Sequence, residues 1–208
     1  MEKIARYITT FSKFVPPTMA HIPEKLLADS SVHFKIVKGR KSKWGDFRPK
    51  NSKGKPQITV NGDLNPYAFL ITTLHEFAHL HTFQTYGFRA SPHGLEWKEN
   101  FSKLIALILD HPDLPASIRT ALSKSYNAIK ASSCTDIHLS RTLATFDNDT
   151  TGLVPLENLT KNSKFALNNR TFQKGNKRRT RFECIELSSN RTYLVHLMAK
   201  VKPLHDGE

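Results

Sequence analysis

The chain has 208 residues, of which 38% are hydrophobic and 24% are charged, and its formal net charge is +13. This length and composition are typical of a globular protein with one well-packed core and a small second module. No apolar run approaches the roughly 20 residues needed to cross a bilayer, so we expect no membrane partner. A basic excess of this size attracts polyanions where it is clustered.

The first expected element is an amphipathic helix before the Pro16-Pro17 pair. Its apolar residues recur at helical spacing: Ile4, Ile8, Phe11 and Val15. The segment lacks the continuous apolar run of a secretion signal, so we expect this helix to pack on the core. Binding to a membrane surface is the alternative interpretation.

Two tracts hold much of the basic charge. Residues 35–55 carry nine lysines and arginines against one acid, Asp46, and residues 161–181 carry eight and no acid. The accompanying aromatic residues are Trp44, Phe47, Phe165, Phe172 and Phe182. Cationic groups hold phosphates and aromatic faces stack on bases, so the tracts predict a DNA or RNA surface. The residues expected to make it are Arg40, Lys41, Lys43, Lys177, Arg178 and Arg179. Solvated basic loops are the alternative.

A short strand and three helices are expected between the two tracts. The strand covers residues 57–60 and is followed by an Asn61-Gly62 turn. The first helix runs from Tyr67 to about Tyr86. The second carries an apolar stripe from Trp97 to Ile108 and ends before Pro112, and the third covers residues 115–130.

The pattern changes after the third helix. We expect a connector over 131–152, with one short helical piece whose apolar side chains are Leu139, Leu143 and Phe146. Short β runs follow, at residues 164–167, 170–172, 180–187 and 191–197. The sequence therefore predicts an α+β protein, with a helical domain that includes a small sheet over 1–130 and a basic antiparallel β module over 153–208.

The helix at 67–86 contains a potential metal site, His75-Glu76-x-x-His79. Residues four apart lie on one helix face, so both rings can direct a nitrogen at one ion, with Glu76 about 100° around the axis. The strongly apolar residues fall on the other side: Leu70, Leu74, Phe77 and Leu80. The alternative is a pair of surface or capping histidines.

A third ligand distinguishes these interpretations, because catalytic zinc usually keeps three protein ligands and one open position. His93 stands where the chain turns into the next helix. Gly94 permits close backbone approach there, and Trp97 anchors the helix to the core. Competing ligands are Glu96, Glu99 and Asp110. We expect His81, on the apolar side of its helix, to be a packed or partly exposed residue.

The run His75-Glu76-x-x-His79, followed by His93-Gly94-x-x-Trp97, resembles the SprT-like (Spartan-type) zinc metalloproteases. Residues 43–74, with Gly45 and Asn61, are also similar to the strand and entry helix of that family. The resemblance covers residues 1–130 and implies a zincin-like metalloprotease domain whose substrates are proteins attached or crosslinked to DNA. Many members add a zinc ribbon with two cysteine pairs. After Leu153 this chain has only Cys184, so we expect a metal-free, ribbon-like module.

The expected chemistry is zinc-dependent hydrolysis of peptide bonds. Zn²⁺ held by His75, His79 and His93 would activate water, and Glu76 would take its proton and pass it to the leaving amine. Tyr67 and Tyr86 are possible second donors to the oxyanion. Two other functions stay open. One is a nucleic-acid-binding zinc protein without protease activity, and the other is a general metallopeptidase for unfolded protein.

The cysteines indicate a reducing compartment. Cys134 and Cys184 are too few and too far apart for a disulfide framework or a metal-binding pair. We expect structural thiols, with a regulatory cysteine as the alternative. The expected location is the cytoplasm, in association with the nucleoid, or the nucleus if the host cell has one. The expected oligomeric state is a monomer.

Overall fold

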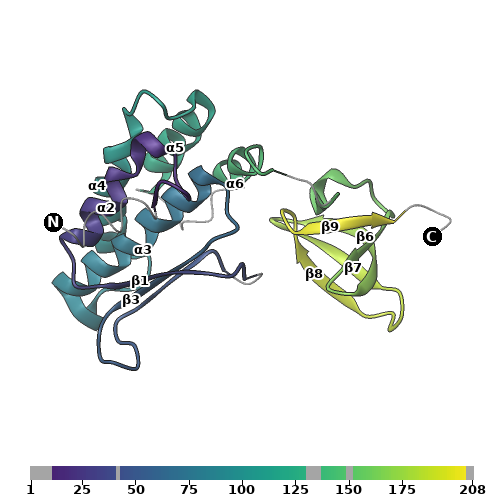
Figure 1. The fold of residues 1–208 in the computed structure, drawn as a ribbon. Helices are drawn as coiled ribbons and strands as arrows, with labels where there is room; N and C mark the ends of the chain where they lie inside the picture. Colours follow the sequence, from purple (N-terminus) through teal and green to yellow (C-terminus); the bar gives the residue numbers. More distant parts are fainter. Residues whose placement is uncertain (1–10, 41–42, 130–136, 149–151, 205–208) are drawn as a thin grey trace. The chain divides into compact units, whose positions relative to one another are not determined.

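The computed structural model describes residues 11–40, 43–129, 137–148 and 152–204. These residues form two compact units, residues 1–147 and 148–208, which Figure 1 shows in purple to green and in green to yellow. Helices dominate the first unit and strands the second, so the α+β class is confirmed. Among the helices described, none combines the length and the hydropathy that a bilayer span requires.

The first unit contains a small sheet and a set of helices. Its elements are η1 (Pro17–Met19), α2 (His21–Ala28), β1 (His33–Val37), β2 (Gly45–Arg48), β3 (Gln57–Asn61), α3 (Pro66–Tyr86), η2 (Gly87–Arg89), α4 (Leu95–Leu109), α5 (Ala116–Ile129) and α6 (Ile137–Ala144). The predicted strand and three helices correspond to β3, α3, α4 and α5. The sequence patterns did not reveal α2, β1 or β2. Strand β2 lies within the basic tract and β1 overlaps its start, and neither shows a regular alternation of buried and exposed residues.

The sheet has the order β1-β3-β2, with β1 parallel and β2 antiparallel to the central β3. Successive side chains of a strand point to opposite faces. Ile58 and Val60 of β3 are fully buried in the core. Thr59 and Asn61 therefore lie on the outer face. Strand β2 pairs only with β3 among the described strands, so its second edge is unpaired.

Helix α3 is the centre of the first unit. It lies between the sheet and α4 (Figure 1). The predicted core residues Leu70, Leu74, Phe77 and Leu80 have no exposed surface. Thr73 and Ala78 are also fully buried, so α3 has no broad solvent-facing side. The expectation of a helix with one buried back was therefore incomplete, because β2 and α4 enclose the opposite side as well.

The start of the chain contributes to the same core. Phe11 and Val15 are 1% and 2% exposed, as expected for residues that pack inward. Residues 1–10 of the predicted N-terminal helix lie outside the described residues.

Asn65 joins the start of α3 to α6. Its side-chain oxygen accepts the Ala68 N–H at 2.9 Å and caps α3, while its amide donates to the Leu143 carbonyl at 2.9 Å and to Asp147 at 2.7 Å. Leu143 is buried in the core of the first unit. The short helical piece predicted within the connector over 131–152 is α6, and it packs as a core element of the first unit.

The second unit is an antiparallel sheet. Its strands are β4 (Val154–Pro155), β5 (Lys164–Leu167), β6 (Arg170–Arg178), β7 (Arg181–Glu186), β8 (Thr192–His196) and β9 (Lys200–Leu204), with a short helix η3 (Leu156–Asn158) after β4. Their order is β4-β9-β5-β6-β7-β8. The predicted antiparallel β module is thus present. The first and last strands of the module in chain order, β4 and β9, pair with each other. The sequence patterns did not predict these two strands.

The aromatic residues of the second unit build its core. Phe165, Phe172 and Phe182 are at most 9% exposed, and the rings of Phe165 and Phe172 stack at 5.5 Å. The expectation that these rings stack on bases is therefore wrong. The buried thiol of Cys184 lies in the same core, which agrees with a structural role. Cys134 lies outside the described residues.

Lys174 is the unusual member of the second basic tract, because it is 4% exposed. Its ammonium donates to the carbonyls of Glu157 and Leu159 and lies 3.9 Å from the centre of the Phe182 ring. It therefore ties the chain after β4 to the sheet and does not contribute to a surface for phosphates.

The capping role of Asn65 predicts a graded loss of stability. Asn65→Ala should lower the free energy of unfolding by about 2 kcal/mol, since it removes a helix cap and the link to α6. Asn65→Ser should lose less, because serine retains a cap acceptor. Urea denaturation measures both. An Asn65→Ala protein as stable as the wild type would contradict the assignment of α6 to the first unit.

Candidate metal centre

Three imidazoles converge at one point beside α3. His75 and His79 lie one turn apart, and their Nε2 atoms are 3.3 Å from each other. His93, in the loop between η2 and α4, brings its Nε2 to 3.1 Å from each of the other two. The predicted ligands are therefore brought together although His79 and His93 are 14 positions apart in the sequence.

The size of this nitrogen triangle fits one metal ion. Tetrahedral coordination with bonds of about 2.0–2.1 Å requires ligand nitrogens about 3.3–3.4 Å apart, and the observed separations are 3.1–3.3 Å. Within the described ranges, these histidines form the cluster whose ligand atoms lie within 4.8 Å of one another. The competing carboxylates Glu96, Glu99 and Asp110 are not part of it. The cluster could hold a metal ion.

The imidazoles are held in the neutral form that binds metals. Burial, together with the neighbouring histidines, lowers the pKa of His75 to about 3 and that of His79 to about 4. Burial also lowers the pKa of His93. Near neutral pH, therefore, the three rings carry lone pairs and no charge. This state favours a cation at the point where they meet.

The backbone at His93 is shaped to direct the ring inward. Its φ of +57° lies in the left-handed region, which residues other than glycine seldom adopt. The turn is closed by the Gly94 N–H, which donates to the Ser91 carbonyl at 2.9 Å. A Cβ on Gly94 would lie 2.9 Å from that same oxygen. The close backbone approach expected at Gly94 is therefore present.

Trp97 forms the floor of the histidine cluster. It is fully buried, and its ring lies 4.7, 5.2 and 4.7 Å from the rings of His75, His79 and His93. On its other side it stacks on Phe101 at 4.8 Å. The indole therefore fixes the orientation of all three imidazoles and anchors α4, as expected. His81 is half-buried against Phe77, also as expected.

Glu76 lies beside the histidines and is 5% exposed. Burial and, to a lesser degree, Asp46 raise the pKa of its carboxyl to about 8, while Arg40, Lys43 and the N–H of Phe47 oppose that rise. A cation at the imidazole nitrogens would lower this pKa and favour the carboxylate. A metal bound at the imidazoles and the charged form of Glu76 would therefore stabilise each other.

The side chain of Glu76 packs against strand β2. A Cβ on Gly45 would come within 2.8 Å of both Cγ and Cδ of Glu76, so only glycine leaves room for this carboxyl. The next residue on the same strand face, Phe47, donates its N–H to Glu76 and lies parallel to the His79 ring at 6.4 Å. Neither role was predicted, because no local pattern shows that β2 crosses α3 at Glu76.

The site opens into a cavity of about 500 Å³. The lining residues come from β2, α3, η2 and the loop before α4: Gly45, Asp46, Phe47, His75, Glu76, His79, Thr82, Phe83, Gly87, Phe88, Ala90, Ser91, Pro92, His93 and Trp97. Tyr67 and Tyr86 are not among them, and Tyr67 packs edge-on against Phe146 at 4.9 Å. Neither tyrosine thus occupies the place expected of an oxyanion donor.

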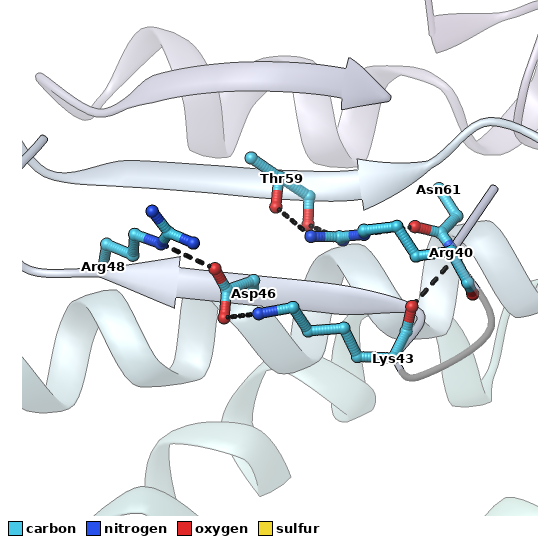
Figure 2. Close-up of polar contacts among 6 residues, drawn as sticks. All are labelled: Arg40, Lys43, Asp46, Arg48, Thr59 and Asn61. Atoms are coloured by element: carbon cyan, nitrogen blue, oxygen red, sulfur yellow. Dashed lines mark hydrogen bonds and ion pairs between the residues drawn. The ribbon is translucent and has the colours of Figure 1, made fainter. Parts of the chain in front are cut away.

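Three cations of the first basic tract, Arg40, Lys43 and Arg48, make internal contacts on the outer face of the sheet (Figure 2). Arg40 donates to the side chains of Asn61 at 2.8 Å and Thr59 at 3.1 Å. Asn61 in turn donates to the carbonyls of Arg40 and Lys43, both at 3.0 Å. These bonds hold the backbone at Arg40 and Lys43 against β3. Arg40 therefore has a structural role that the sequence did not indicate.

Lys43 is engaged in the same region. Its ammonium pairs with Asp46 at 2.6 Å, and Arg48 pairs with the other oxygen of Asp46 at 2.9 Å (Figure 2). Lys41 lies outside the described residues. The nucleic-acid surface expected at Arg40, Lys41 and Lys43 thus lacks support from the two of them that are described. Trp44 is the exposed aromatic residue here, at 45%.

The second basic tract ends in an exposed hairpin of β6 and β7. Lys177, Arg178 and Arg179 all project into solvent. Arg178 pairs with Glu183 at 2.8 Å and is still 70% exposed. Arg179 stands at the tip with a φ of +49°. All three named cations of this hairpin are exposed, whereas Arg40 of the other predicted nucleic-acid site is half-buried.

Comparison with known families, with characterised proteins and with solved structures finds no significant match.

The nitrogen triangle predicts a metal content of about one ion per chain after purification without chelators. His93→Ala should lose most of this metal, because two histidines remain. The matched control is His33→Ala, an exposed histidine on β1, which should retain the metal. Elemental analysis by mass spectrometry measures all three. Stoichiometric metal in His93→Ala would assign the third ligand to another residue.

The close contact at Gly45 predicts that its replacement depends on Glu76. Gly45→Ala should lower the free energy of unfolding by about 1–3 kcal/mol, since the added methyl overlaps the Glu76 carboxyl. In a Glu76→Ala background the same change should cost much less, because the overlap is gone. Urea denaturation measures both losses of unfolding free energy. Equal losses in the two backgrounds would show that Gly45 does not make room for the Glu76 carboxyl.

Proposed function

We propose that this protein is a zinc-dependent endopeptidase. The observation that carries the proposal is the triangle of three imidazole nitrogens with the buried carboxyl of Glu76 beside it, open to a cavity. Three nitrogen ligands and an open position are typical of catalytic zinc, whereas structural zinc usually has four protein ligands. Imidazole also suits copper, iron and nickel. We propose zinc because Zn²⁺ activates water for hydrolysis and has no redox chemistry of its own.

The residues divide the work of hydrolysis as follows. Zinc bound by the three histidines would supply Lewis-acid activation of water and of the peptide carbonyl. Glu76 accepts one proton from the attacking water and gives it to the leaving amine, so that water and a peptide bond become a carboxyl and an amino group. Gly45 and the Phe47 N–H keep the carboxyl in place during both transfers. Trp97 keeps the imidazoles aligned.

The unpaired edge of β2 supports an extended polypeptide as the substrate. Gly45, Asp46 and Phe47 line the cavity and belong to this edge strand. A peptide that adds to the edge obtains backbone hydrogen bonds whatever its sequence, apart from the Phe47 N–H, which is donated to Glu76. Because such pairing needs an extended chain, unfolded or locally opened segments are the proposed substrates.

We further propose that the first unit has a zincin-like, SprT-like architecture. The support is the metal-binding helix α3 beside a sheet whose edge strand lines the cavity, together with the sequence resemblance. On this proposal the substrates are proteins bound or crosslinked to DNA. The exposed hairpin at Lys177–Arg179 supports this assignment, because it offers cations to phosphates.

Two alternatives remain distinguishable. A nucleic-acid-binding zinc protein without protease activity would use the same hairpin, but it has no need of a buried carboxyl beside three ligands. A general peptidase for unfolded protein would share the cavity and β2, and would bind neither DNA nor RNA. Cleavage assays with and without nucleic acid separate all three.

Glu76→Gln tests the peptidase proposal directly. The amide keeps the shape of the side chain but cannot accept the proton, so cleavage of an unfolded protein should fall by at least about 100-fold. The bound metal should remain at the wild-type level, as elemental analysis would show. Undiminished proteolysis with intact metal binding would refute the role of Glu76.

The hairpin predicts where nucleic acid binds. Reversing the charges of Lys177, Arg178 and Arg179 to glutamate should weaken DNA binding and lower its salt dependence by roughly one unit of slope per lost phosphate contact. The matched control reverses three exposed lysines of the first unit, and its residues are Lys25, Lys103 and Lys124. This control has the same net charge. Equal weakening of binding in both variants would indicate a diffuse charge effect.

A further inference from the structure

We infer that the cavity contains a subsite for one large apolar side chain of the substrate, formed by Phe47, Phe83 and Phe88. This inference rests on the proposed function and extends it to a substrate preference. The three rings come from β2, α3 and η2, and all line the cavity next to the histidines.

The rings form a continuous wall. Phe47 lies parallel to the His79 ring at 6.4 Å, the Phe83 ring is 5.9 Å from Phe47, and the Phe88 ring is 5.2 Å from Phe83. Each step is within or close to the range of aromatic contact. The wall therefore leads from a proposed metal ligand away from the ion, as a pocket for a neighbouring substrate side chain would.

Phe88 is 83% exposed, which is unusual for so large an apolar side chain. One contact with Phe83 does not account for its position, since most of its surface gains nothing from the fold. The backbone turns just before Phe88, where Gly87 ends α3 with a φ of +60°. An apolar group from another molecule would cover the ring and remove this surface from water.

The position of the wall also fits the β2 edge. Phe47 and Gly45 share the strand face that looks toward α3. When a peptide adds to an edge strand, the side chain opposite Phe47 points to this same face. That side chain would reach the aromatic wall, while its neighbours on the peptide would point to the other face. A single apolar residue near the cleaved bond is therefore the occupant.

The lining excludes other occupants. The neighbours of Phe83 and Phe88 in the lining are Thr82, Gly87, Ala90, Ser91 and Pro92, none of them charged, and the charged lining residues, Asp46 and Glu76, lie at β2 and at the metal centre. A charged substrate side chain would be desolvated there without a partner. Leucine, methionine or phenylalanine is favoured over serine, aspartate or lysine.

The test compares Phe88→Ser with Leu107→Ser in the zinc-loaded protein. Leu107 is an exposed apolar residue of α4, 52% exposed, that does not line the cavity. Cleavage sites are mapped by mass spectrometry in one unfolded protein, and kcat/KM is measured on paired peptides that carry leucine or serine at the favoured position. The wild type and Leu107→Ser should prefer leucine by about tenfold or more, and Phe88→Ser should lose most of this preference.

A binding measurement separates failure of the subsite from failure of the proposed function. Fluorescence anisotropy of the same labelled peptides is measured with Glu76→Gln protein, with and without Phe88→Ser. Tighter binding of the leucine peptide that depends on Phe88, in a protein whose wild type cleaves nothing, would retain the subsite and overturn the peptidase. Cleavage without leucine preference, or a preference unaffected by Phe88→Ser, would overturn the subsite and retain the peptidase.

Discussion

The burial of α3 on nearly all sides is the constraint on which the rest of the site depends. Leu70, Leu74 and Leu80 have no exposed surface and hold the helix against the core. A helix fixed in this way can neither rotate nor slide, so the imidazoles of His75 and His79 are held at a fixed height and angle. Trp97 then closes the opposite side and positions His93. The nitrogen triangle is thus a product of core packing.

The same packing makes the charged form of the Glu76 carboxyl unfavourable. A carboxyl that is 5% exposed is costly to ionise, which is why its pKa rises to about 8. Three neutral imidazoles beside it offer a place for a cation that would offset this cost. Gly45 leaves the space for the carboxyl, and Arg40, which precedes β2, is bonded to Asn61 and Thr59 of β3. The outer face of the sheet therefore supports the candidate metal centre on its inner side.

The sequence predicted the parts of the site that depend on local spacing. His75, Glu76 and His79 follow from a four-residue interval, and His93 follows from the turn that Gly94 permits. Contacts between distant segments were not predictable in this way. Gly45 and Phe47 meet α3 only after β2 has paired with β3, and the phenylalanines expected to stack on bases form the core of the second unit because the strands there alternate. Basic composition likewise did not distinguish Arg40, which is bonded to the sheet, from the exposed arginines of the hairpin.

The most direct test of the metal centre is anomalous diffraction at the zinc absorption edge from crystals of the zinc-loaded protein. The account predicts one strong peak at about 2.0–2.1 Å from the Nε2 atoms of His75, His79 and His93, with Glu76 beside the ion and outside its coordination shell. A peak bound by a different set of residues, or Glu76 as a direct ligand in place of one histidine, would contradict it.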